Sequence, residues 1–322
     1  MGQLVARCRW TRLCIASGRI TLIGTRIGHK SVVTSEDPET GVRQRLAFSA
    51  EGPDSASLHY EYTGAGRKMT VDVERSAQVS IHFVPSPNSE RAEVRYHQPE
   101  RGPVSLEIRC VDGDRRIAAS GFWRLVLAAP ELCAKHFLPV AESLRPGWAL
   151  EAQARQLEEA LLAGARSGPR SQEGRWAALV RDLGHPRFQR RQQADRQLRA
   201  MGQFVVPFLE RLESESLSTE QRVRVRHILE ALAVPDGDTP VRVAAWLAGD
   251  AEVWIALLDR PEAEKRAVAM QRLATLCGRP LALDPLARAD ERHRQIARLR
   301  AELGLDPPIR ISEKDGGATR HR

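Results

Sequence analysis

Hydrophobic residues recur at every second position between residues 20 and 119, which is the pattern of strands that bury one face and expose the other. Turn-forming runs rich in Gly, Pro, Asn and Ser separate the alternating segments. The pattern predicts strands at 58–62, 69–74, 79–83, 92–96 and 104–109, with further strands around 20–27, 42–48 and 116–117. Because no helical segment intervenes, we expect an antiparallel meander or a small sandwich.

The hydrophobic spacing changes to that of helices after residue 119. Ser120 is a suitable N-cap, and Pro130 is a suitable first helical residue. The helices predicted up to residue 162 carry more large hydrophobic side chains than isolated helices can bury. We therefore expect them to cover the sheet, so that residues 20–164 form one β-rich domain and the fold class is α+β.

Composition defines the remaining segments. Residues 1–19 are basic and are predicted to be either poorly ordered or partly docked. Residues 165–174 are small, polar and turn-forming, which is typical of a linker. Residues 175–305 have helical periodicity, and residues 306–322 are predicted to be a disordered tail.

The helical half contains two segments of similar design. Trp176 begins the first and Trp254 begins the second, and each segment runs to a proline that starts a helix, Pro186 or Pro261. Small and large residues then match at the same offset of 75, namely Ala194 with Ala269, Leu198 with Leu273 and Met201 with Leu276. A small residue lets a neighbouring helix approach, and the leucine one turn later fills the space beside it.

The segment from His185 to Leu232, with RQQADRQLRAMGQFVVPFLERL at its centre, resembles the HEAT-like repeats of bacterial multidomain proteins. This resemblance implies a stack of helix pairs that is used as a binding surface rather than as a catalytic centre. It covers residues 176–232 well and residues 240–303 loosely. Prolines at 280 and 285 interrupt the expected second helix of the second segment, which favours a short, capped array.

Charge and cysteine content narrow the function classes. The formal net charge is +8, and only five of the 49 basic residues are Lys. GC-rich coding produces such an excess of Arg without selection for phosphate contacts. No hydrophobic run approaches the ~18 residues of a membrane span. The five cysteines are scattered without a Cys-x-x-Cys pair, so we expect a reducing, cytoplasmic location, with export as the alternative.

No motif predicts a catalytic, cofactor-binding or metal-binding site. Residues 64–68 contain glycines and a lysine but lie between two strands, so a hairpin loop is favoured over a phosphate loop. Cys133 and His136 have the spacing of half a zinc site, but no second pair exists, and core packing is favoured. Residues 112–114 and 236–238 resemble fragments of calcium loops and are expected to be turns.

Five arginines near the first helix of the repeat are the candidate partner-binding residues, Arg187, Arg190, Arg191, Arg196 and Arg199. They are expected to bind an acidic partner or, in the alternative, to form a solvated face paired with Asp195, Glu210 and Glu213. The sequence thus predicts a non-catalytic scaffold or adaptor that binds another protein. Nucleic-acid binding through residues 187–199 is the second hypothesis, and an enzyme with its site between the sheet and the covering helices is the third.

Overall fold

A computed structural model describes most of the chain. The described residues are 5, 11–24, 28–52, 55–87, 89–110, 113–166, 169–202, 205–210, 212, 217–232, 237–306 and 309–312. The chain divides into two compact units, which are treated separately below. The sheet unit comprises Met1–Ala152 with Leu303–Arg322, and the helical unit comprises Gln153–Glu302.

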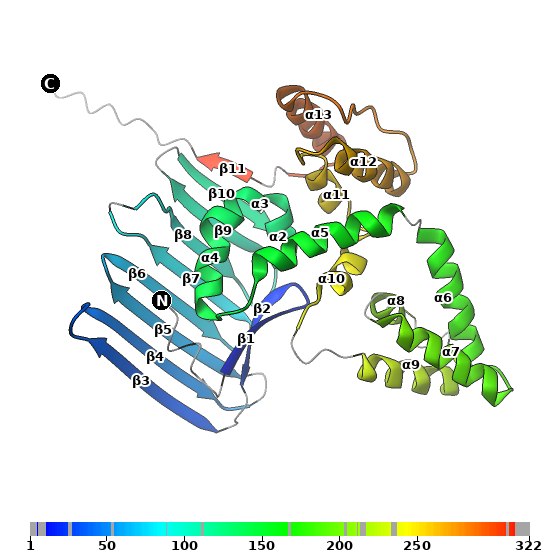
Figure 1. Cartoon of the computed structure of the whole chain (residues 1–322), viewed down its shortest axis with the longest axis horizontal. Coiled ribbons are helices and arrows are strands. Elements are labelled where there is room, and N and C mark those ends of the chain that lie inside the picture. The colour runs from blue at the N-terminus through cyan, green and yellow to red at the C-terminus, as the bar shows by residue number, and fades with distance from the viewer. Residues whose placement is uncertain are drawn as a thin grey trace. The chain divides into compact units, whose positions relative to one another are not determined.

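The sheet unit contains a nine-stranded antiparallel meander (Figure 1). Its strands are β3 (His29–Asp37), β4 (Val42–Ala50), β5 (Ala56–Gly64), β6 (Arg67–Glu74), β7 (Gln78–Val84), β8 (Glu93–Gln98), β9 (Val104–Cys110), β10 (Gly113–Ala119) and β11 (Ile309–Ser312). Strand order follows the chain from β3 to β10, and β11 is added beside β10. The predicted α+β class and antiparallel meander are confirmed.

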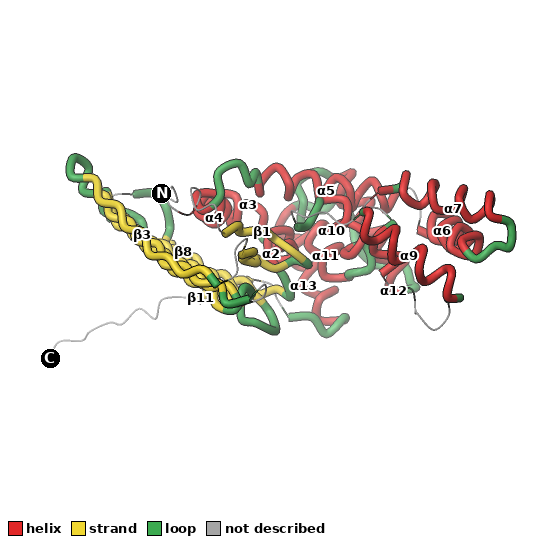
Figure 2. The backbone as a smooth tube through the Cα atoms, turned by 90° about the horizontal axis from the view of Figure 1, so that it is seen from below, coloured by secondary structure: helices red, strands yellow, loops and turns green. Residues whose placement is uncertain are grey.

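Short helices cover one face of this sheet (Figures 1 and 2). They are α2 (Phe122–Ala128), α3 (Pro130–Leu132), the π-helical turn η1 (Cys133–Phe137) and α4 (Leu138–Leu144). Tyr96 of β8 stacks on Phe137 at 5.0 Å and meets the edge of Phe122 at 6.4 Å, so strand and helix side chains share one core. Pro130 starts α3 as predicted, whereas Gly121 rather than Ser120 is the N-cap residue of α2.

A separate hairpin lies at the start of the sheet unit. Strands β1 (Thr11–Ala16) and β2 (Arg19–Gly24) pair with each other. The buried side chain of Gln98 joins the hairpin to the sheet, because its Nε2 donates to the Ile20 carbonyl at 2.7 Å and its Oε1 accepts from the Ile20 amide at 2.9 Å. This part of segment 1–19 is therefore docked through buried Leu13 and Ile15, while residues 1–4 and 6–10 lie outside the described residues.

The structure differs from the sequence-based boundaries at two further places. Helices α5 (Leu150–Arg166) and α6 (Pro169–Leu183) occupy most of the predicted linker at 165–174. Ala, Arg, Gln and Glu are good helix formers, so a polar composition does not distinguish a linker from a helix end. Within the predicted tail, Ile309–Ser312 form β11, and residues 313–322 lie outside the described residues.

The helical unit continues from α5 and α6 with α7 (Phe188–Ala200), α8 (Val206–Glu210), α9 (Thr219–Ala231), α10 (Pro240–Leu247), α11 (Ala251–Leu257), α12 (Ala263–Cys277) and α13 (Ala289–Glu302). Helices α6, α7 and α9 enclose a core that includes Leu183, Leu198 and Ile228. No helix in the described part of the chain combines the length and the hydrophobicity that crossing a membrane would require.

The matching segments share local geometry. Helices α7 and α12 each begin two residues after the proline, and Ala194, Leu198, Ala269 and Leu273 are buried, whereas Leu276 is exposed. The two tryptophans are not equivalent, because Trp254 stands at the offset of 75 from Leu179 rather than from Trp176. Trp254 is fully buried, whereas Trp176 packs against Phe208 at 5.5 Å. The HEAT-like resemblance itself stays a prediction.

Candidate functional site

A polar groove of about 470 Å³ lies between α7 and α9 of the helical unit. One wall carries residues spaced by three or four positions along α7, and the other wall carries an equivalent stripe along α9. The lining residues are Gln192, Asp195, Arg196, Arg199, Glu220, Val223, Arg224 and His227. Each wall is therefore one face of a helix, which holds the side chains in fixed register.

Local interactions position α9 against the rest of the unit. Ser218 and Gln221 form a capping box, in which the Gln221 amide donates to Ser218 Oγ at 3.3 Å and the Ser218 amide donates to Gln221 Oε1 at 2.8 Å. The Gln221 Nε2 also donates to the carbonyl of Val180 on α6 at 2.9 Å. One side chain thus fixes both the start of α9 and its contact with α6.

The structure separates the five arginines expected to bind a partner. Arg196 and Arg199 line the groove, whereas Arg187, Arg190 and Arg191 do not. Ala194 and Leu198 face the core, and Arg190 lies about 60° from them and roughly opposite the groove at 100° per residue. The groove therefore does not collect all five guanidinium groups. Arg190 faces away from it, whereas Arg191 lies beside it, with its Nε 3.4 Å from Oε1 of the lining residue Glu220.

The predicted pairing of these arginines is found only in part. Arg199 Nε lies 2.6 Å from Asp195 Oδ1, and Arg191 Nε lies 3.4 Å from Glu220 Oε1. Glu210 instead contacts Arg242 at 2.7 Å, and Glu213 lies outside the described residues. Of the five candidate arginines, Arg187, Arg190 and Arg196 make no ion pair among the described residues.

Arg191 has a structural role that the sequence interpretation missed. Its Nη1 donates to the carbonyl oxygens of His185 and Pro186, both at 2.9 Å. These carbonyls precede α7 and have no place in its hydrogen-bond ladder. Arg191 therefore stabilises the turn into α7 and is not available as a free cation.

Two hydrophobic side chains are exposed beside the groove. Phe188 of α7 and Val223 of α9 are 56% and 42% exposed. Phe188 is six residues from Ala194, which turns it about 120° away from the core, and Val223 is rotated similarly from Ile228. Phe188 lies one turn before Gln192, so it extends the groove stripe of α7. Helical phase alone could have found both residues.

The groove has a mixed charge pattern. Arg224 pairs with Glu220 at 2.7 Å and Arg199 pairs with Asp195, so two of its three arginines are neutralised by acids within the groove. Arg196 and His227 are exposed and make no ion pair among the described residues. Within the described part of the chain, the groove thus offers a cation without an ion pair, Arg196, an exposed imidazole, His227, and two nearby hydrophobic side chains.

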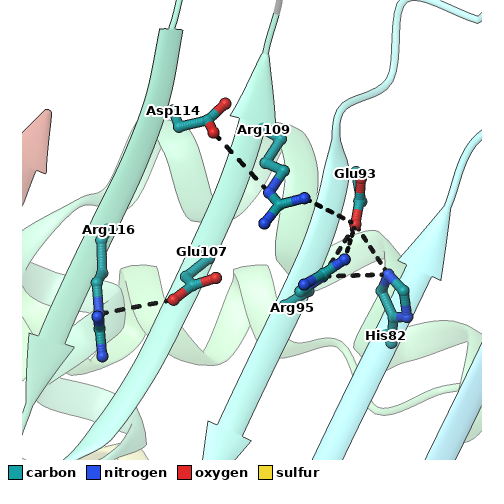
Figure 3. Close-up of polar contacts among 7 residues, drawn as sticks. All are labelled: His82, Glu93, Arg95, Glu107, Arg109, Asp114 and Arg116. Atoms are coloured by element: carbon teal, nitrogen blue, oxygen red, sulfur yellow. Dashed lines mark hydrogen bonds and ion pairs between the residues drawn. The ribbon is translucent and has the colours of Figure 1, made fainter. Parts of the chain in front are cut away.

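The uncovered face of the sheet carries a second group of charges, which Figure 3 shows. Glu93 Oε1 lies 2.9 Å from His82 Nε2, 2.8 Å from Arg95 and 3.9 Å from Arg109. Partial burial by itself favours a higher pKa for Glu93. Hydrogen bonds from His82 and Arg95 and the nearby guanidinium charges outweigh burial, so the pKa of Glu93 lies below its usual value. Glu93 is consequently an ionised cross-strand partner rather than a proton donor at neutral pH.

Core packing accounts for Cys133 and His136 between the sheet and its covering helices. Both are buried, burial raises the pKa of the Cys133 thiol, and its Sγ contacts the Leu125 carbonyl at 3.9 Å. Burial and then the Lys135 charge lower the pKa of His136. Within the described ranges, no three His, Cys, Asp or Glu side chains are placed to hold a metal ion. Residues 64–68 form the predicted β5–β6 hairpin, and residues 112 and 236 lie outside the description.

Comparisons with known proteins give no information on function, so the function is inferred below from the surface chemistry of the chain. No family model matches the chain, and no curated protein or solved structure is significantly similar to it.

Proposed function

We propose that this chain is a non-catalytic adaptor whose α7–α9 groove binds an acidic, partly hydrophobic segment of a partner protein. The observation that carries the proposal is the exposure of Phe188 and Val223 along the groove that also holds Arg196, which makes no ion pair among the described residues. Exposed aromatic and Arg side chains contribute disproportionately to protein–protein binding energy. The HEAT-like resemblance supports the same type of function.

The charge pattern favours a short acidic segment over a uniformly anionic ligand. A carboxylate near Arg196 gains a partner without competing with an existing ion pair. A row of phosphates would have to compete with Asp195 and Glu220 for Arg199 and Arg224, which already pair with these carboxylates. A peptide can place hydrophobic side chains against Phe188 and Val223 and keep its acidic residue at Arg196, whereas a phosphate backbone cannot.

Peptide display on the intact chain tests this proposal. We expect enrichment of sequences in which an acidic residue lies within one or two helical turns of a large hydrophobic residue. The Phe188→Ala and Arg196→Glu variants should each weaken binding of an enriched peptide about tenfold or more, which corresponds to about 1.4 kcal/mol. Arg298→Glu is the matched control, because Arg298 is also exposed and unpaired within the described residues but lies on α13.

Equal binding by the Arg196→Glu and Arg298→Glu variants would refute the groove as the binding site. Selection of peptides without acidic residues would refute the proposed ligand chemistry. Arg191→Glu is unsuitable for this purpose, because its loss of binding could arise from the disrupted turn before α7.

Nucleic-acid binding is the second candidate, and one observation favours it. Arg187, Arg190 and Arg196 are exposed and lack ion pairs within the described part of the chain. A gel shift at low salt that weakens steeply with added salt would support this function, because each neutralised phosphate releases counterions. Loss of that shift in an Arg187→Glu/Arg190→Glu variant, with peptide binding retained, would assign the two activities to different surfaces.

A further inference from the structure

Strand β3 forms a long, open edge of the sheet. Among the described residues it pairs with β4 on one side, and no strand pairs with its other side. Seven of its nine residues are exposed, and its centre, residues 31–35, contains only Ser, Val and Thr. Such an uncharged, β-branched edge presents backbone donors and acceptors to another strand. Pro38 follows the strand rather than interrupting it.

The sequence of β3 is complementary to itself when two copies run antiparallel. A two-fold axis through Val33 keeps like faces together, as edge pairing requires. In this register Lys30 faces Glu36 of the second copy, and Val33 faces Val33. All nine residues pair, and His29 stands opposite Asp37. Moving the axis by one residue places Lys30 opposite Thr34 or Val32 opposite Glu36, so only the central register matches both charges.

We propose that the chain forms a homodimer through antiparallel pairing of β3 with β3 of a second copy. The dimer joins the two sheets into one continuous sheet centred on Val33. The opposite edge strand, β11, has four residues against the nine of β3 and offers a much shorter pairing surface.

Existing ion pairs on the uncovered face fit this arrangement. Glu36 contacts Arg43 of β4 at 2.7 Å, and Lys30 contacts Glu51 at 3.4 Å. In the dimer, Lys30 of one copy adds a second cation to the Glu36–Arg43 pair of the other. The resulting row has a carboxylate between two cations, which is a favourable cross-strand order. Val32 and Val33 are 63% and 38% exposed and point to opposite faces of the sheet. In the dimer, the strand of the second copy lies beside both residues and reduces their exposure.

Analytical ultracentrifugation of the full chain and two charge variants tests the dimer. Lys30→Glu places two carboxylates opposite each other across the interface, and Glu36→Lys places two ammonium groups opposite each other. Each variant should therefore dimerise at least about tenfold more weakly than the wild type. An equimolar mixture of the two variants should dimerise again, because both contacts then pair opposite charges. Lys68→Glu, on the same face of central strand β6, is the control and should dimerise like the wild type.

Three results would overturn the proposal: a wild-type chain that is monomeric up to about 1 mM, variants that dimerise like the wild type, or a mixture that stays monomeric. Far-UV circular dichroism shows whether each variant is folded. Hydrogen exchange of the wild type gives a second readout that needs no substitution. The outward amides of β3 should become more protected as concentration rises, and unchanged exchange at a concentration where the chain is dimeric would place the interface elsewhere.

Discussion

Arg191 and Arg266 make the same contacts in two helical segments that are 75 positions apart. Nη1 of Arg191 donates to the carbonyls of His185 and Pro186, and Nη1 of Arg266 donates to those of Arg260 and Pro261 at 2.7 and 2.6 Å. In both cases the arginine reaches back over the first turn of its own helix to the chain that enters it. The shared contact is a stronger link between the segments than the tryptophans are.

Replacing these arginines by Met should affect stability unequally. Arg266 is almost fully buried and its Nε also donates to the Pro285 carbonyl at 2.6 Å, so Arg266→Met should lower the free energy of unfolding by about 3 kcal/mol. Arg191 is more exposed, and Arg191→Met should cost about 1 kcal/mol. Urea unfolding measures both changes. A larger loss for Arg191→Met would contradict the burial argument.

The Gln98→Leu substitution should detach the β1–β2 hairpin. The side chain of Gln98 is buried and makes four hydrogen bonds, to the Ile20 amide and carbonyl, the Ala77 carbonyl and the Tyr96 hydroxyl. Leu fills a similar volume but leaves buried polar groups unsatisfied, so we expect a loss of about 3 kcal/mol and faster hydrogen exchange in β2. Tyr96→Phe, which removes one of the four bonds, should cost about 1 kcal/mol.

The Glu158→Gln substitution should destabilise the helical unit by about 3 kcal/mol, because it removes a carboxylate charge that contacts the largely buried guanidinium of Arg260. Glu158 lies 2.6 Å from Arg260 Nε and 2.9 Å from Lys265 Nζ. The Lys265→Met variant should cost less than about 1 kcal/mol, since Lys265 is more exposed and Glu158 keeps its contact with Arg260 after the substitution. Thermal unfolding of both variants gives the comparison, and equal losses would show that the Arg260 contact is not dominant.

The His59–Asp72 contact should make stability depend on pH. The hydrogen bond that His59 Nδ1 donates to Asp72 Oδ1 at 2.6 Å, followed by the weaker effects of Glu61 and both acidic charges, raises the pKa of His59 above its usual value despite partial burial. The resulting stabilisation is complete below about pH 6.5 and is lost as the pH rises through the folded-state value. Because the pair is exposed to solvent, the effect should stay under about 1 kcal/mol.

Unfolding of wild type and His59→Gln across pH 5–9 checks this dependence. The stability difference between them should shrink as the pH increases. A difference that grows with pH would mean that the histidine is stabilised in its neutral form, and Asp72→Asn should remove most of the effect.

The hydrophobic pattern of the sequence determined the secondary structure in elements that bury one face, because their buried residues recur at regular intervals. Strands β5 to β9 alternate because one face of each is buried, and that alternation is visible without coordinates. Strand β3 was not predicted, since an exposed edge strand has no buried face to impose alternation. The predicted linker became helix because its residues form helices as readily as loops.

The number of charged residues could be read from the sequence, but the partners of each charged side chain could not be predicted from it. The five arginines near α7 are similarly spaced in the sequence but have different partners. Arg191 donates to backbone carbonyls and Arg199 pairs with Asp195. Of the five, Arg196 alone lines the groove without an ion pair within the described residues. The buried positions of one helix or strand recur with a fixed period, so they can be predicted from the hydrophobic pattern of the sequence. Hydrogen bonds and ion pairs depend on which atoms of distant elements meet, and only the tertiary structure decides that.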